Sequence, residues 1–479
     1  MKNLTPQKLL RLLQEKAIAV LGFGVEGKSA VNYLLRQGIK NITVCDQKNA
    51  AELPLFEELK KLPVKRQLGV GWERGIAEGQ FDLVIRSPGV PPTLPFLKKI
   101  SSKKSKTKLV STTKFFFDLT PAPILGITGT KGKGTTASLA YQIIKQNREK
   151  GKVYLGGNIG VAPFDFLEKL TGNDLVVLEL SSFQLVDLDS SPHWAVVLNV
   201  TSDHLDWHRS QEEYLAAKYN IVKHQYRDDF AIVNADYLTS IEFATQTNGQ
   251  VWWFSARKSV DRGMWWQKDE KEEKLYFRPF PRSKPLPVLT ESEVKLLGRH
   301  NLENVAAAAL ASYLVGVKLS QIAPVVRRFR GLPHRLQKIA TIEGIEFVED
   351  SFSTNPQTAI AAIRSFDQPK ILILGGYDKN ISFRELAENI VSTNVRAVVL
   401  IGQTARKIAA AIKAAGKRKK LPQIKFARSL DEAVRQAYQI ANAGEVVLFS
   451  PACASFDMFT DYKERGEKFI ECVKKLQLA

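Results

Sequence analysis

The chain has 479 residues, which is too many for a single hydrophobic core and predicts two or three domains of roughly 100–200 residues each. Its hydrophobic content of 44% and charged content of 25% are typical of a globular protein, and no run of about 18 apolar residues predicts a membrane span. The net charge of +20 is compatible with nucleic acid, an acidic membrane surface or small polyanionic substrates as partners. Because no groove-entering motif accompanies this charge, we expect no nucleic-acid partner.

The cysteines and the amino terminus indicate the compartment. Cys45, Cys453 and Cys472 are too few and too far apart for a disulfide framework or a thiolate metal site. The amino-terminal residues lack the uninterrupted apolar core of a signal peptide. We therefore expect a cytoplasmic protein.

Residues 1–118 are predicted to form a first α/β domain. The apolar run at 17–24, the amphipathic run at 28–38 and the apolar run at 41–46 predict a strand, a helix and a strand. A further apolar run at 81–89 ends at a turn. This alternation predicts a Rossmann-like parallel sheet whose ligand site lies at the carboxyl ends of the strands.

Residues 119–331 are predicted to form a central ATPase domain. Strands are expected at 123–129, 174–180 and 195–201. Residues 250–297 contain aromatic-rich runs that indicate hairpins, so we expect an antiparallel appendage there.

Residues 332–479 are predicted to form a third domain, which is again Rossmann-like. Its strands are expected at 370–376, 397–402 and 445–451, with helices between them. The predicted fold class is therefore α/β, with three domains.

The segment GITGTKGKGTT (126–136) resembles the phosphate-loop pattern G-x-x-x-x-G-K-[ST] between a strand and a helix. Backbone amides of such a loop surround phosphates, its lysine neutralises phosphate oxygens, and a hydroxyl reaches Mg²⁺. Because Gly134 follows Lys133, the hydroxyl must come from Thr135 or Thr136, and Thr135 is preferred. The predicted ATP-binding residues of the loop are Gly129, Thr130, Lys131, Gly132, Lys133, Gly134, Thr135 and Thr136.

The segment GFGVEG (22–27) matches G-x-G-x-x-G after a predicted strand, and Asp46 ends the following strand. The pattern predicts a nucleotide diphosphate at the start of the next helix. NAD and a UDP-sugar fit it equally well, and an ordinary strand–helix turn is the structural alternative.

Three further charged positions lie at predicted strand ends or on a predicted helix. Glu179 ends the strand 174–180, where it could bind Mg²⁺ or form a salt bridge. His204 lies in DHLDWH (203–208). A role beside a second metal ion or a phosphate is favoured over a zinc site, because no thiol or third spaced histidine is present, and an ordinary polar loop is the alternative. Lys218 lies on a predicted helix, and its spacing alone predicts an ordinary solvated lysine.

Two polar segments complete the set of candidates. Asn301 and Asn304 lie one turn apart at the start of the Ala-rich helix expected at 300–316, where they could contact adenine or ribose or simply cap the helix. SPACASFD (450–457) could hold a carboxylate or form a tight turn.

Taken together, these segments resemble the Mur ligase family, the ATP-dependent amide-bond ligases that build the peptidoglycan stem peptide. Within the family they are most similar to the branch that adds glutamate to UDP-N-acetylmuramoyl-L-alanine. The motifs occur in the family's order and are GFGVEGKS, SPGVPP (87–92), GITGTKGKGTT, GGNIG (156–160), LELSSFQL, NVTSDHLD, AAK (216–218), HNLEN, GLPHR, TNP (354–356), LGGYDK (374–379) and SPACAS.

The resemblance implies a reaction and the residues that serve it. It implies ATP-dependent addition of D-glutamate through an acyl phosphate, two Mg²⁺ ions, a carbamylated Lys218, closure of the third domain over its substrates and a monomeric protein. The implied catalytic residues are Lys133, His204 and Lys218, and the implied metal ligands are Thr135, Glu179, His204 and carbamylated Lys218. Implied ATP contacts outside the loop are Asn301, Asn304, Arg335 and Asp350, and implied glutamate contacts are Thr354, Lys379 and Ser455. The implied UDP-substrate contacts are Gly22, Phe23, Gly24, Val25, Glu26, Gly27, Asp46, Ser87, Pro88, Gly89 and Asn158.

The sequence departs from this pattern at two positions. Gly134 resembles the GKG of the folylpolyglutamate synthetases, relatives that share the ATPase domain but lack the GFGVEG domain and SPACAS. Phe352, in DSFST (350–354), replaces the usual lysine of the glutamate ligases. The DS-x-ST pattern also resembles a branch that adds L-glutamate, so L-glutamate is the alternative acceptor.

Overall fold

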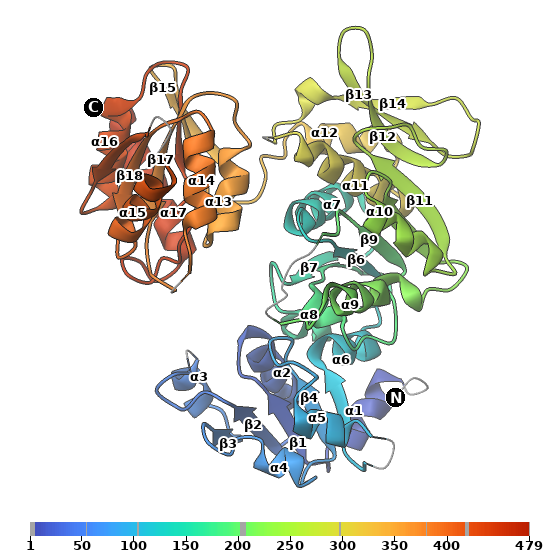
Figure 1. Ribbon diagram of the computed structural model, residues 1–479. Helices are drawn as coiled ribbons and strands as arrows, with labels where there is room; N and C mark the ends of the chain where they lie inside the picture. The colour runs from blue at the N-terminus through green and yellow to red at the C-terminus, as the bar shows by residue number, and fades with distance from the viewer. Residues whose placement is uncertain are drawn as a thin grey trace. The chain divides into compact units, whose positions relative to one another are not determined.

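The computed structural model describes residues 5–53, 55–102, 105–201, 207–296, 298–379, 381–416 and 421–478 (Figure 1). They form two compact units. The first contains the chain up to residue 294 together with 300–328, and the second contains 295–299 and the chain from residue 329 onwards. Three sheets, two in the first unit and one in the second, confirm the predicted α/β class. The division into residues 1–118, 119–331 and 332–479 stays a prediction.

The first sheet is parallel, with strand order β3-β2-β1-β4-β5. Strands β1, β2 and β4 are buried along their whole length, because helices cover both faces of such a sheet. The elements are β1 (Ile18–Leu21), β2 (Ile42–Asp46), β3 (Lys65–Leu68), β4 (Leu83–Arg86), β5 (Lys108–Ser111), α1 (Pro6–Leu13), α2 (Val25–Arg36), α3 (Phe56–Lys60), α4 (Arg74–Ala77), α5 (Pro95–Ile100) and α6 (Thr112–Leu119). The strand order reverses between β1 and β4, where a ligand site is expected.

The second sheet has strand order β14-β13-β12-β11-β10-β9-β6-β8-β7. Helices α7 and α11 pack against each other beside it. Its strands are β6 (Ile124–Thr128), β7 (Val153–Gly157), β8 (Leu175–Glu179), β9 (Trp194–Val197), β10 (Phe230–Asn234), β11 (Gln250–Ser255), β12 (Gly263–Lys268), β13 (Glu273–Arg278) and β14 (Leu286–Thr290). Its helices are α7 (Lys133–Asn147), α8 (Ser182–Leu185), α9 (Gln211–Lys223), α10 (Leu238–Ile241), α11 (His300–Leu314) and α12 (Ile322–Val326), with short 3-10 turns η1 (Pro163–Asp165) and η2 (Leu167–Lys169).

The antiparallel appendage is shorter than expected. Pairing is antiparallel only from β12 to β13 and from β13 to β14. Strand β11 pairs in parallel with both β10 and β12, so the hairpin expected at the start of 250–297 was wrong. α10 and the following 3-10 turn (Glu242–Thr245) carry the chain back along β10 before β11 begins, which makes β11 parallel to β10. Residues 256–262 likewise carry the chain back along β11 before β12 begins, so these two strands form a crossover in place of a hairpin.

One hydrophobic core joins the first two sheets. Phe164 of η1 is buried, and its ring centroid lies 5.4 Å from that of Tyr33 in α2 and 5.8 Å from that of Phe115 in α6. A hydrogen bond also joins the two parts beside this core, since Ser29 Oγ in α2 donates to Asp165 Oδ1 in η1 at 2.6 Å. The two sheets therefore belong to a single compact unit.

The third sheet has strand order β15-β16-β20-β17-β18-β19 and is parallel except for the β15–β16 pair. Side chains of β18 alternate between two hydrophobic cores, one on each face of the sheet. The elements are β15 (Gln337–Ile342), β16 (Ile345–Glu349), β17 (Lys370–Gly375), β18 (Val395–Ile401), β19 (Gln423–Phe426), β20 (Val446–Phe449), α13 (Pro356–Ile363), α14 (Arg384–Ser392), α15 (Ala405–Ala415), α16 (Leu430–Ile440) and α17 (Tyr462–Leu478). Among all helices of the described segments, none is long and apolar enough to cross a membrane.

Candidate functional site

The predicted phosphate loop connects β6 to α7. Gly132, the residue before α7, has a φ of 85°, a left-handed conformation that glycine adopts without steric cost. The Lys133 ammonium lies over the loop and donates to the carbonyl oxygens of Gly129 at 3.1 Å and Thr130 at 3.0 Å. The start of α7 thus presents backbone amides and a cation together, as phosphate binding requires.

Two asparagines of α11 support this loop. Asn304 accepts a hydrogen bond from the Thr136 hydroxyl at 3.2 Å and donates to Asn301 Oδ1 at 2.8 Å. A Cβ atom at Gly132 would lie only 2.2 Å from Asn304 Oδ1, so the loop packs directly on this amide. The Thr136 hydroxyl is thus tied to α11, and Thr135 as the metal ligand stays a prediction.

Lys218 lies at the base of the loop and is only 1% exposed. Its ammonium donates to Thr128 Oγ1 at 3.1 Å and to the Gly129 carbonyl at 3.0 Å, and it lies 4.9 Å from the centre of the Tyr214 ring. The solvated lysine predicted from spacing alone was wrong, because α9 faces the carboxyl end of β6 at this position. Lys133 and Lys218 therefore share one acceptor, the Gly129 carbonyl oxygen.

Glu179 is the last residue of β8, beside β6 in the sheet, and is 4% exposed. Its carboxylate accepts a hydrogen bond from the Asn158 side-chain amide at 3.1 Å, and Asn158 N–H also donates to the Glu179 carbonyl. Across the described segments of the chain Glu179 makes no ion pair, which disfavours the salt-bridge alternative. A carboxylate oxygen near the phosphate loop is a donor that Mg²⁺ prefers.

The remaining metal candidates lie in and after DHLDWH (203–208). His204 falls within residues 202–206, outside the described residues. His208 is buried, and its Nε2 lies 2.9 Å from Ser182 Oγ of α8, which is a structural role. Within the described ranges no group of three His, Cys, Asp or Glu side chains could hold a metal ion. The oxygen donors Thr135 and Glu179 suit Mg²⁺, whereas Lys218 could contribute only after its cation is converted to an anion.

The predicted UDP-substrate residues lie at the reversal between β1 and β4. Ser87 Oγ donates to the Gly22 carbonyl at 2.7 Å, and a Cβ at Gly27 would lie 2.0 Å from that same oxygen. Asp46 Oδ2 accepts from the N–H of Phe23, whose side chain is buried and therefore unavailable to a ligand. The structure brings together the turn between β1 and α2, the turn after β4 and the end of β2. Gly24 lies in the first of these turns, Val25 begins α2, and Pro88 and Gly89 lie in the turn after β4.

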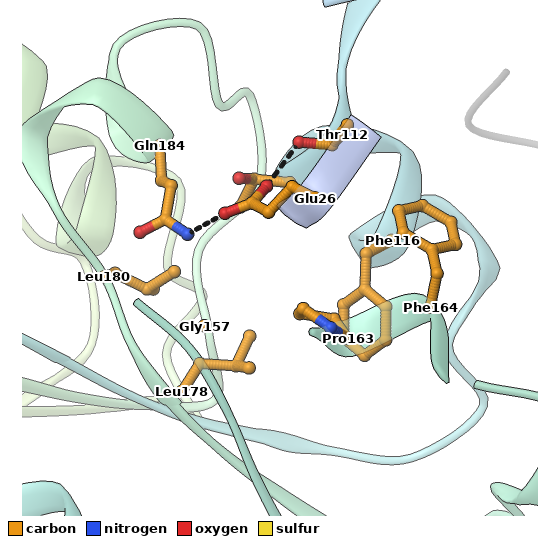
Figure 2. Close-up of a pocket in the computed structure, with 10 residues that line it drawn as sticks. Glu26, Thr112, Phe116, Gly157, Pro163, Phe164, Leu178, Leu180 and Gln184 are labelled. Carbon is orange, nitrogen blue, oxygen red and sulfur yellow. Dashed lines mark hydrogen bonds between the residues drawn. The ribbon is translucent and has the colours of Figure 1, made fainter. Parts of the chain in front are cut away.

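Glu26 differs from its neighbours, because its carboxylate does not point to the surface of this turn (Figure 2). It accepts hydrogen bonds from Thr112 Oγ1 and Gln184 Nε2, both at 2.6 Å. Part of the Glu26 residue is accessible to solvent, but its carboxyl group is enclosed. Removal of this carboxyl group from water raises its pKa.

Sequence reasoning missed Arg86, the last residue of β4. Its side chain is fully buried and donates to the Val90 carbonyl at 2.6 Å and to Asp187 at 3.0 Å. It therefore fixes the SPGVPP turn to the loop that follows α8. The only signal in the sequence was a cation directly after the apolar run Leu83–Ile85.

In the second unit, Arg335 lies just before β15 and Asp350 just after β16, and the two segments are joined because Leu336 N–H donates to Asp350 at 3.1 Å. Asp350 accepts hydrogen bonds from Ser353 Oγ at 2.5 Å and Ser450 Oγ at 2.7 Å, and burial raises its pKa to about 6. The Arg335 guanidinium lies 5.3 Å from the centre of the Phe352 ring. Phe352, where the glutamate ligases usually have lysine, thus contacts the predicted ATP-binding arginine.

Arg335 is flanked by two residues with left-handed backbone, His334 at φ 64° and Leu336 at φ 45°. Such a conformation is strained for both residue types. His334 Nδ1 lies 3.0 Å from Glu349 Oε2, which raises the pKa of His334, and Leu336 N–H donates to Asp350. These contacts hold the strained turn in place.

The predicted glutamate residues follow the neighbouring strands β16, β17 and β20. Tyr377 N–H donates to the Ala454 carbonyl at 2.9 Å, which joins the LGGYDK segment to SPACAS. Lys379 is exposed, Ser455 is buried and Thr354 is half-buried. Because parallel strands end at one edge of a sheet, the three residues lie at the same edge.

Gly132→Ala should disable the phosphate loop. Alanine strains the left-handed backbone by about 1–2 kcal/mol and pushes its Cβ into Asn304, which Thr136 and Asn301 hold in place. We expect affinity for Mg·ADP, measured by titration calorimetry, to fall at least tenfold. Gly38→Ala is the matched control, because Gly38 has a φ of 79° but no atom within 4 Å of the added Cβ. Equal Mg·ADP affinity in both variants would contradict the role of this contact.

Asp350→Asn should remove one component of the pH dependence of stability. The folded-state pKa of Asp350 lies near 6, above its ordinary 3.8, so its stabilising contribution is present below about pH 4 and is lost as the pH rises through 6. We expect the free energy of unfolding, measured with urea at pH 4 and pH 7, to fall by about 2 kcal/mol more in the wild type than in Asp350→Asn. Parallel pH profiles would show that Asp350 is not protonated in this range.

Family models match most of the chain. The Mur ligase MurD-like N-terminal domain matches residues 16–107, the Mur ligase middle domain matches 127–312, and the Mur ligase glutamate ligase domain matches 334–453.

Relatives extend this similarity over the full length. The UDP-N-acetylmuramoylalanine–D-glutamate ligase of Acetivibrio thermocellus is 38% identical over 471 residues, which cover 97% of each chain. The ligase of the same name from Symbiobacterium thermophilum is 37% identical and covers 97% of this chain and 99% of its own. The crystal structure of the UDP-N-acetylmuramate–alanine ligase of Thermotoga maritima shares the fold, with a TM-score of 0.56 at 18% identity over 96% of this chain and 100% of that one. The chain therefore belongs to the Mur ligase family.

Proposed function

We propose that this protein is an ATP-dependent ligase that adds D-glutamate to UDP-N-acetylmuramoyl-L-alanine in peptidoglycan precursor synthesis. The observation that carries the proposal is the convergence of Lys133 and Lys218 on the Gly129 carbonyl, at a phosphate loop beside Glu179. Full-length relatives named as D-glutamate ligases support the choice of substrate.

The proposed chemistry follows from charge. The L-alanine carboxylate attacks the γ-phosphate of ATP, so that a carboxyl–phosphate bond forms, the bond to the β-phosphate oxygen breaks, and ADP leaves. The glutamate amine then attacks the activated carbonyl and loses a proton, and phosphate leaves. In the first step two anions must approach each other, and Lys133 lowers the cost by neutralising the phosphate oxygens.

The magnesium sites are part of the proposal. Thr135, Glu179 and His204 would hold two Mg²⁺ ions together with Lys218, whose amine would add to carbon dioxide and release a proton, leaving a carbamate. When bound, Mg²⁺ supplies further neutralisation of phosphate charge. The burial of Lys218 supports this role, because its side-chain nitrogen lies at the base of the phosphate loop, beside Thr128 and the Gly129 carbonyl.

The other substrate contacts stay predictions. The turn at Gly22–Gly27, Asp46, the turn at Ser87–Gly89 and Asn158 would hold the UDP substrate. Asn301, Asn304, Arg335 and Asp350 would serve ATP, and Thr354, Lys379 and Ser455 would hold glutamate. Because Asn304 bonds Thr136, its contribution to ATP binding would be to support the loop.

We also propose that the protein works in the cytoplasm as a monomer without a nucleic-acid partner. Its high positive charge is compatible with these substrates, since UDP, ATP and glutamate are all anions.

The direct test is phosphate release from ATP with UDP-N-acetylmuramoyl-L-alanine and each enantiomer of glutamate. We expect release with D-glutamate and at least a hundredfold less with L-glutamate. Turnover with L-glutamate only would identify the alternative acceptor branch, and turnover with a folate in place of the UDP substrate would overturn the proposal. Lys133→Ala is the control, because it should abolish release while UDP-substrate binding persists.

Lys218→Ala tests the carbamate. We expect turnover to fall at least a hundredfold, because the anion that would share a metal ion is lost, and to recover in part with added acetate or formate, which could supply a carboxylate in its place. Phosphate release with and without these salts measures both effects. A fully active variant would remove the carbamate from the mechanism, and loss without any recovery would favour a purely cationic role.

A further inference from the structure

The helix that carries the predicted UDP-substrate turn is tied to the segment that follows the predicted metal ligand. We propose that Glu26 is a positioning residue, which holds the first turn of α2 against α8 through Gln184 and so fixes the spacing between the UDP-substrate turn and Glu179. The kinetic part of this inference rests on the proposed function.

Glu26 connects three elements (Figure 2). Each of its carboxylate oxygens accepts a bond of 2.6 Å, one from Gln184 Nε2 in α8 and the other from Thr112 Oγ1 in α6. The residue stands next to Gly27, whose close approach to the Gly22 carbonyl forms the predicted UDP-substrate turn. A shift of the Glu26 side chain would therefore move this turn.

Gln184 links Glu26 to the segment that follows Glu179, the predicted metal ligand. Its Oε1 accepts from Ser181 N–H at 2.9 Å and Ser181 Oγ at 3.0 Å, in a capping box that starts α8. Between Ser181 and Glu179, Leu180 N–H donates to the Ile127 carbonyl and the Leu180 carbonyl accepts from Thr128 Oγ1. The segment from Glu179 to Gln184 is thus fixed to the end of β6, where the phosphate loop begins.

The surroundings of Glu26 leave little freedom and no space for a substrate group. Its carboxylate lines a cavity of about 10 Å³, the size of one water molecule, whose walls include Phe116, Phe164, Leu178 and Leu180. In such apolar surroundings an unpaired partner of a hydrogen bond is destabilising, and a charged one is more so. Glu26 is therefore placed to align two sites, rather than to contact the substrate.

The chain allows a sharp test, because the two side chains can be exchanged. Gln184→Glu alone places two carboxylates face to face. The exchange Glu26→Gln with Gln184→Glu keeps every bond described above. The carboxylate introduced at position 184 can accept from Ser181 and from the amide introduced at position 26, and the oxygen of that amide can accept from Thr112.

We expect Gln184→Glu to lower kcat for ligation 10- to 100-fold, because displacement of reacting groups by about 1 Å has effects of this size. Binding of UDP alone and of Mg·ADP alone, measured by calorimetry, should change less than threefold. The exchanged variant should regain kcat to within about threefold of the wild type. Ser29→Ala is the control, because it removes another 2.6 Å hydrogen bond from α2, to Asp165, and should leave kcat unchanged.

Three results would overturn the inference. They are wild-type kcat in Gln184→Glu, no recovery in the exchanged variant, and a loss in Ser29→Ala equal to that in Gln184→Glu. A rise in KM for the UDP substrate in Glu26→Gln, without a change in kcat, would assign Glu26 to substrate contact instead. If the wild-type chain performs no ligation, the proposed function fails, and the link is then judged from the unfolding midpoints, which should fall in Gln184→Glu and recover in the exchanged variant.

Discussion

The candidate site depends on one carbonyl oxygen that accepts hydrogen bonds from two cations. Lys133 comes from the helix that follows the phosphate loop, and Lys218 comes from α9, more than eighty residues later, yet both reach the oxygen of Gly129. Lys218 is buried, so little water surrounds its ammonium group. The contacts of α7 and α9 with β6 bring the two side chains to the same loop. The loop therefore presents positive charge to an anion before one binds.

The two units place their candidate residues by different means. In the first unit, glycines bring backbone close to backbone, and carboxyl and amide side chains such as Glu26, Gln184 and Asn304 fix the resulting turns. In the second unit, residues with side chains occupy strained positions around Arg335, and a buried acid and an ion pair hold them there. Strain of this kind persists only where its surroundings determine the conformation. Arg335 is therefore presented on a rigid turn, with Phe352 against one face of its guanidinium.

Much of this could be predicted from the sequence, because apolar runs bounded by glycines mark buried parallel strands with little ambiguity. The strands before the phosphate loop and before Gly22 lie where their patterns indicate. Three features could not be predicted, since each depends on contacts between distant segments. Lys218 has the spacing of a surface lysine, and only the fold buries it. Glu26 sits inside a ligand-binding pattern, but its partners Thr112 and Gln184 lie 86 and 158 residues away. The parallel pairing of β11 with its two neighbours follows from the path of the chain through α10 and through residues 256–262, which local composition does not encode.

The shared core around Phe164 has a consequence for how such an enzyme can be taken apart or recombined. A substrate-binding domain with a separate hydrophobic core can be exchanged between related proteins at the linker that joins it to the rest of the chain. Here the rings of Tyr33 and Phe115 pack against Phe164 of η1, so cutting the chain near residue 119 would expose apolar surface on both pieces. The smallest transplantable part that includes the first sheet is therefore the whole first unit. A chimaera with a new nucleotide-sugar specificity should be made by changing loops within that unit.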